Sequence, residues 1–243
     1  MKKLVAFLFS FVLVISAISV CAEGGQPETI QFRGIPWLSD YATVKPQLDG
    51  IEGISKSWYK GVEEMARIEG WYRQWSNMYA DDNVTDGGVM LRYTDATVAG
   101  YKASLTASFI YPIEGKIAYN TNKALFYKGE YKITDLEDIE GAYNDMVSKL
   151  TSLYGAPEDK SYYNSMYKVD SPKGSVWTAK DGSIVWAGIY YNSFNKRYDE
   201  LWIVYSAPGT TEMLNALSDQ IKQEAADAEA AERENNSSNF DGL

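Results

Sequence analysis

The clearest helical periodicity in the chain lies in residues 135–157, "DLEDIEGAYNDMVSKLTSLYGAP". Its apolar positions fall on one helical stripe: Ile139, Tyr143, Met146, Leu150, Leu153 and Tyr154. Acidic residues precede this stripe, where they favour the start of a helix. Gly155 can adopt the left-handed conformation that ends a helix, and Pro157 prevents its continuation. The pattern therefore predicts an amphipathic helix that ends at Gly155.

Three segments rich in β-branched and aromatic residues follow this helix: "GSVWTAK", "SIVWAGIYYN" and "ELWIVYSAP". The pair Asp181-Gly182 between the first two is typical of a tight β-hairpin, so we expect adjacent antiparallel strands. The second and third segments carry apolar residues at successive positions, such as Val185 and Trp186. They are therefore expected at the centre of a sheet that is covered on both faces.

The first half of the chain carries similar segments: "GVMLRYTDATVAGYKASLTASFIYP", "KIAYN" and "ALFYKGEYKIT". These segments predict a β-meander, with turns at Glu114-Gly115 and at Lys128-Gly129. A further helix is predicted upstream, in residues 55–75. Its apolar stripe comprises Trp58, Val62, Met65 and Ile68.

The hexapeptide "FRGIPW" joins the extended segment "TIQF", which we interpret as a strand leaving the sheet, to a predicted helix over "SDYATVKPQL". Gly34 permits an unusual backbone angle, and Pro36 restricts the preceding residue to an extended conformation. Trp37 is expected to anchor this turn in the core, and Ser39 or Asp40 to cap the helix. The alternative is that Trp37 is exposed and binds a partner.

The C-terminal segment keeps apolar residues at helical spacing from Thr211 only as far as Ile221. The next segment, "KQEAADAEAAERE", offers only alanine as an apolar face. We predict a helix over residues 210–234 that docks at its start and then extends into solvent. Residues 235–243, "NNSSNFDGL", are predicted to be disordered. A partner-binding helix in residues 222–234 is the alternative to a solvated acidic one.

The N-terminal segment has the pattern of a secretory signal. Lys2 and Lys3 precede a long uncharged run that ends in "VCAEGG". Residues 1–22 are therefore predicted to be a signal peptide that is cleaved after Ala22, which places the mature protein outside the cell. Two alternatives are a lipoprotein with Cys21 as the lipidated residue, and a membrane anchor formed by the uncleaved run.

The chain has 243 residues, and the predicted cleavage leaves 221, enough for one large domain or two smaller halves. Its formal charge of −10 becomes −12 on cleavage, because the signal carries Lys2 and Lys3 and no acid. Nucleic acids and anionic membranes both favour positively charged proteins. We therefore expect neither as a partner of the mature protein.

Cysteine and histidine are almost absent, and this excludes several kinds of chemistry. Cys21 is the only cysteine and there is no histidine, so the mature chain has no disulfide. Ser-His-Asp and Cys-His nucleophile systems and the usual zinc ligand sets are excluded. "DDNVTDGG" resembles a calcium loop only faintly, because it lacks the terminal glutamate. We predict no metal and no cofactor, and we identify no catalytic residue.

Carboxylates and aromatic rings keep a glycan ligand open as an alternative. Hydrolysis of a glycosidic bond needs two carboxyl groups at a defined separation. The candidate acids are Glu63, Glu64, Glu137, Asp138, Asp199 and Glu200. Aromatic faces stack on sugars, and exposure of at least two such rings on one sheet face would favour glycan binding. The rings in question are Trp177, Trp186, Tyr190, Tyr191 and Trp202.

The order of these features along the chain resembles that of a known group of proteins. "FRGIPW", a hairpin region, an acidic helix ending in "LTSLYGAP", aromatic strands and a tail ending in "DGL" resemble uncharacterised small secreted proteins of anaerobic Gram-positive bacteria. Their organisation is similar to the beta-lactamase inhibitor protein fold, with two tandem units of a helix and an antiparallel sheet. The resemblance spans about residues 28–207. Leu38 departs from its pattern, in which a small residue follows the tryptophan, and Pro46 interrupts the predicted first helix.

The sequence therefore predicts an α+β protein with a first helix-and-meander unit in residues 28–134 and a second in residues 135–209, followed by the C-terminal acidic helix. We expect a secreted, monomeric, non-catalytic module that binds a protein or a glycan. Binding of macromolecules is what the resemblance implies; it implies no catalytic residue. A glycan-binding protein or a carboxylate-based glycan hydrolase is the alternative.

Overall fold

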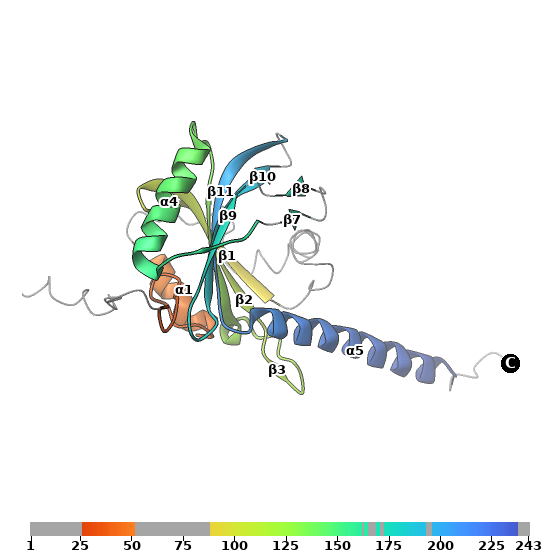
Figure 1. Ribbon diagram of the computed structural model, residues 1–243. Coiled ribbons are helices and arrows are strands. Elements are labelled where there is room, and N and C mark those ends of the chain that lie inside the picture. Colours follow the sequence, from red (N-terminus) through yellow and green to blue (C-terminus); the bar gives the residue numbers. More distant parts are fainter. Residues whose placement is uncertain are drawn as a thin grey trace, which may run out of the picture.

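The computed structural model describes residues 26–51, 88–161, 163–164, 169–170, 173–192 and 196–237. These residues form α-helices and antiparallel strands, which confirms the α+β class (Figure 1). The predicted signal peptide, the predicted helix of residues 55–75 and the segment "DDNVTDGG" lie outside the described residues, apart from the last glycine. No helix in the described part of the chain is both long and apolar enough to cross a membrane.

The central element is a seven-stranded antiparallel sheet with the order β1-β2-β5-β11-β10-β9-β6. The strands are β1 (Gly88–Val98), β2 (Tyr101–Ile110), β5 (Leu125–Ile133), β6 (Glu158–Asp159), β9 (Gly174–Thr178), β10 (Ile184–Asn192) and β11 (Arg197–Ser206). β3 (Ile113–Glu114) pairs with β4 (Lys116–Ile117), and β7 (Tyr163–Asn164) with β8 (Val169–Asp170). Because β5 pairs with β11, strands from both halves of the chain belong to one sheet.

Two helices lie on the same face of this sheet, α1 (Tyr41–Asp49) and α4 (Ile139–Tyr154) (Figure 1). The predicted helix that ends at Gly155 is confirmed as α4: Asp138 caps its start and Gly155 has a φ of 86°. Tyr143, Met146 and Leu150 are buried, as the stripe predicts. Leu153 was assigned wrongly to the buried stripe, because its side chain is 57% exposed at the last turn.

The segment "FRGIPW" forms a turn whose first and fourth residues, Phe32 and Ile35, are paired through an isolated β-bridge and are buried. Gly34 has a φ of 73°, as the turn requires. The predicted strand over "TIQF" is wrong, because only its last residue takes part in a bridge. Asp40 caps α1 by accepting a hydrogen bond from the Thr43 amide at 2.8 Å.

Pro46 does not interrupt α1, contrary to the sequence expectation, and lies inside it. The missing donor of Pro46 is offset by the packing of the helix face. Tyr41, Val44 and Leu48 are buried in the main core. Tertiary burial therefore outweighs the local preference against proline in this short helix.

Gly129 lies in the middle of β5, so the turn predicted at Lys128-Gly129 is wrong. The ring of Phe32 lies on this glycine: a Cβ at residue 129 would be 2.3 Å from Phe32 Cγ. The glycine thus serves a close packing contact rather than a turn. The turns at Glu114-Gly115 and Asp181-Gly182 are confirmed, with φ values of 77° and 87° at the two glycines.

β10 and β11 lie near the centre of the sheet, as predicted. The face toward the helices is fully buried, with Val185, Leu201 and Ile203 at 0% exposure. On the other face Trp186 and Trp202 are half-buried. Both faces of these strands were predicted to be buried. Burial is complete only on the face toward the helices.

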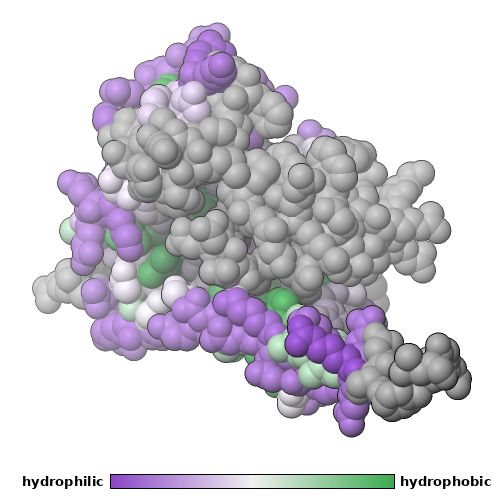
Figure 2. Space-filling view, turned by 90° about the vertical axis from the view of Figure 1, so that its right-hand side faces the viewer, coloured by the Kyte–Doolittle hydropathy of each residue, from purple (hydrophilic) through white to green (hydrophobic). Residues whose placement is uncertain are grey.

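The C-terminal helix α5 (Thr210–Ser237) leaves the body of the protein, as Figure 1 shows. Leu217 packs with Ile110 and Ile117 at its start, and Glu224 accepts a hydrogen bond from the Ile117 amide at 2.7 Å. Residues 225–235 are exposed, so the helix docks at its start as predicted, although the docked part extends to Glu224 and not only to Ile221. The lower edge of the molecule in Figure 2 is mostly hydrophilic. The predicted boundary was too early, because the helix reaches Ser237; residues 238–243 lie outside the described part.

Trp37 is a partly buried anchor, and its replacement should destabilise the protein. Its ring stacks on Phe126 with centroids 5.1 Å apart, and its Nε1 donates to the Ile30 carbonyl at 2.7 Å. Trp37→Ala is expected to cost about 3 kcal/mol, because it removes a large apolar side chain. In thermal denaturation this should lower Tm by at least about 6 °C.

The matched control is Leu38→Ala, because Leu38 is the next residue and is 45% exposed. Its free energy of unfolding should stay within about 0.5 kcal/mol of the wild type. A Tm of Trp37→Ala that also stays within about one degree of wild type would contradict the anchoring role.

Candidate functional site

One buried polar cluster lies where α1 meets β1 and involves Tyr41, Asp49 and Tyr93. Tyr93 donates to Asp49 at 3.0 Å, and Lys45 forms an ion pair with the same carboxylate. Tyr41 is 3% exposed, and its hydroxyl has no hydrogen-bond partner among the residues that the structure describes. Burial and the Asp49 carboxylate raise the pKa of Tyr41 to about 12. Both phenols therefore stay protonated near neutral pH, and the Asp49 carboxylate is engaged by Tyr93 and Lys45.

A second cluster connects "FRGIPW" to the sheet. Arg33 donates to the hydroxyl of Tyr131 at 2.7 Å. Burial raises the pKa values of Tyr131 and Tyr205, whose rings both contact Phe32. These phenols are therefore neutral and serve the core. Arg33, which has a φ of 55°, is held by this hydrogen bond against the turn.

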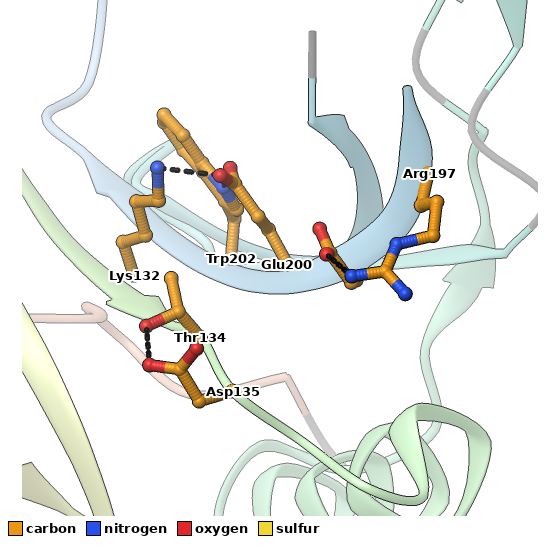
Figure 3. Close-up of polar contacts among 7 residues, drawn as sticks. Lys132, Thr134, Asp135, Arg197, Glu200 and Trp202 are labelled. Atoms are coloured by element: carbon orange, nitrogen blue, oxygen red, sulfur yellow. Dashed lines mark hydrogen bonds and ion pairs between the residues drawn. The ribbon is translucent and has the colours of Figure 1, made fainter. Parts of the chain in front are cut away.

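A buried ion pair lies on the other face of the sheet. Glu200 is 4% exposed; one carboxylate oxygen is 2.6 Å from Lys132 Nζ, and the other accepts from Trp202 Nε1 at 2.8 Å. The Lys132 ammonium lies 5.5 Å from the centroid of the Trp202 ring (Figure 3). Both oxygens of Glu200 are engaged, so this acid holds neighbouring strands together.

The remaining candidate is a cleft of about 330 Å³ at the end of the sheet where β5 leaves and β11 begins. The connection from β5 to α4 forms one wall, and the start of β11 forms the other. Its lining consists of Thr134, Asp135, Leu136, Glu137, Ile139, Arg197, Tyr198 and Asp199. Antiparallel pairing of β5 with β11 places the end of one strand beside the start of the other, although they are far apart in the sequence.

The cleft is polar and predominantly acidic. Arg197 and Asp199 form a loose ion pair at 3.5 Å, and Thr134 donates to Asp135 at 3.1 Å (Figure 3). Tyr198 is 39% exposed, and its ring meets the edge of Tyr191 with centroids 5.3 Å apart. The three carboxylates outnumber the single guanidinium. The cleft can therefore accept hydrogen bonds from a donor-rich ligand and offers an aromatic surface beside them.

The acids that were candidates from the sequence do not all lie at one site in the structure. Glu137 and Asp199 line the same cleft. Asp138 caps α4 by accepting from the Gly141 amide at 2.8 Å, and Glu200 belongs to the buried ion pair. Glu63 and Glu64 lie outside the described residues. In the described part of the chain, no group of three or more acidic, histidine or cysteine side chains could hold a metal ion together.

The aromatic candidates form no exposed platform. Trp177 and Tyr190 are buried, at 2% and 7% exposure. Trp186, Tyr191 and Trp202 are half-buried. Trp177 donates to the Gly155 carbonyl at 2.9 Å and so fixes the end of α4. Because all five rings are buried or half-buried, the structure does not support the stacking of a sugar on two of them.

Sequence reasoning missed Asp135, Arg197 and Tyr198 as members of one cleft. Asp135 follows β5 in a left-handed conformation, with a φ of 58°. The only local signal was a charged and aromatic run, "KRYDE", before a predicted strand. Neither half of the cleft is recognisable alone, because the pairing of β5 with β11 creates it.

Comparisons of the chain with family models, with curated proteins and with solved structures found no match.

The hydroxyls of Tyr41 and Tyr93 differ in their hydrogen bonding, so matched substitutions of the two residues should differ in their effect on stability. Tyr41→Phe should leave the free energy of unfolding unchanged or raise it, because it removes a buried donor that has no partner in the described part of the chain. Tyr93→Phe deletes the same atom but loses the bond to Asp49, and should cost about 1 to 2 kcal/mol. Urea denaturation of both variants measures the difference. Equal destabilisation would show that the two hydroxyls have similar environments.

Proposed function

We propose that the protein is a secreted, non-catalytic binding module that receives its partner in the cleft between the β5–α4 connection and the start of β11. The main support for this proposal is the cleft itself, which combines a volume of about 330 Å³ with charged, aromatic and apolar lining residues. Ligand pockets in proteins range upward from about 300 Å³. A cleft at the small end of that range can hold one side chain. A larger partner would insert such a side chain into it.

The position of the cleft supports this role. Asp135, Glu137 and Tyr198 are exposed, so a large partner can reach them without displacing a buried element. The strands beneath are central in the sheet, and a rigid support lowers the entropic cost of ordering the lining on binding. The overall negative charge favours partners with a basic surface, because it accelerates their approach.

A carboxylate-based glycan hydrolase remains the second candidate, because Glu137 and Asp199 line the same cleft. Such an enzyme would use one carboxyl group as the acid and the other as the base or nucleophile. It should release reducing ends from a polysaccharide, and Glu137→Gln should abolish that release. A binding module releases none while retaining its ligand.

Capture from the native extracellular fraction tests the role of the cleft. The immobilised mature protein should retain a partner that Glu137→Lys fails to retain, because this variant places a cation in an acidic cleft. Glu232→Lys makes the same charge change on the exposed part of α5 and should retain the partner as the wild type does. Equal retention by all three proteins would show that the partner binds elsewhere.

A further inference from the structure

We infer that the group received by the cleft is the guanidinium of an arginine side chain on a partner protein. This inference rests on the proposed function, since it specifies what the same cleft binds. It follows from the hydrogen-bonding capacity of the lining, from its net charge and from its aromatic wall.

The acceptors that remain in the cleft are carboxylate oxygens. Arg197 lies 3.5 Å from Asp199 and partly neutralises it. Thr134 donates to one oxygen of Asp135, which leaves the other oxygen for a ligand. Neither Asp135 nor Glu137 forms an ion pair with any residue that the structure describes. Two carboxylates are thus available to a ligand that brings only donors, and a guanidinium carries five N–H donors and no acceptor.

An anionic group is disfavoured at this position, although α4 begins beside it. The start of a helix ordinarily attracts anions. Here Asp138 already caps the helix through the Gly141 amide, and Glu140 lies in its first turn. The acids at the start of α4 and in the cleft outnumber Arg197 and therefore disfavour an anionic ligand.

The aromatic and apolar parts of the lining favour arginine over a simple ammonium group. Tyr198 presents a partly exposed ring, and planar guanidinium groups stack on such rings. Leu136 and Ile139 offer half-buried apolar surface to the methylene groups of the side chain. Carboxylates can bind a guanidinium through two parallel hydrogen bonds.

The test uses the mature protein and backbone amide NMR spectra with three probes. The first is a blocked Gly-Gly-Arg-Gly-Gly peptide; the second replaces its arginine by citrulline, which is neutral and nearly isosteric; the third is maltotriose. The arginine peptide should shift the amide signals of Asp135 and Tyr198, and the citrulline peptide should not. Glu137→Gln should weaken binding about two- to fivefold, and the matched variant Glu232→Gln should leave it unchanged.

The possible outcomes test the identity of the ligand separately from the role of the cleft as a binding site. Equal shifts with arginine and citrulline, or shifts with maltotriose alone, would overturn the arginine assignment and leave the cleft as a binding site. Absence of shifts with all three probes up to about 10 mM would also overturn it. In that case the capture experiment with Glu137→Lys decides separately whether the cleft binds a partner.

Discussion

The contact of the Phe32 ring with the backbone of Gly129 is the constraint on which the rest of the arrangement depends. Phe32 is fully buried, and its ring meets those of Phe126, Tyr131 and Tyr205. Any side chain at residue 129 would overlap this ring, because even a Cβ would lie 2.3 Å from its Cγ. The N-terminal turn can therefore pack on the sheet only because β5 lacks a side chain at this position.

This contact links the turn to the cleft through β5. The strand lies between β2 and β11, so its position determines where both neighbours pair. Leu201, in the middle of β11, pairs with Ile133 at the end of β5. One wall of the cleft begins at Thr134, directly after Ile133, and the other comprises residues 197–199, shortly before Leu201. A shift of β5 along the sheet would therefore separate the acids on one wall from Tyr198 on the other.

Local patterns in the sequence were sufficient for α4, its end at Gly155 and the hairpin at Asp181-Gly182. These features depend on neighbouring residues, whose preferences the sequence displays directly. The turn at Lys128-Gly129 was mispredicted because a glycine signals either a turn or a close approach, and only the distant Phe32 decides between them. The cleft was unpredictable for the same reason, since it depends on pairing between strands about 70 residues apart.

A double-mutant cycle between Phe32 and Gly129 tests this account most directly. Gly129→Ala, Phe32→Ala and the double variant are compared with the wild type by urea denaturation. If the ring occupies the space above the glycine, Gly129→Ala is strongly destabilising alone and nearly neutral once Phe32 is replaced by alanine. The coupling energy should then exceed about 1 kcal/mol. Additive effects within about 0.5 kcal/mol would contradict the claim that this contact positions the turn on the sheet.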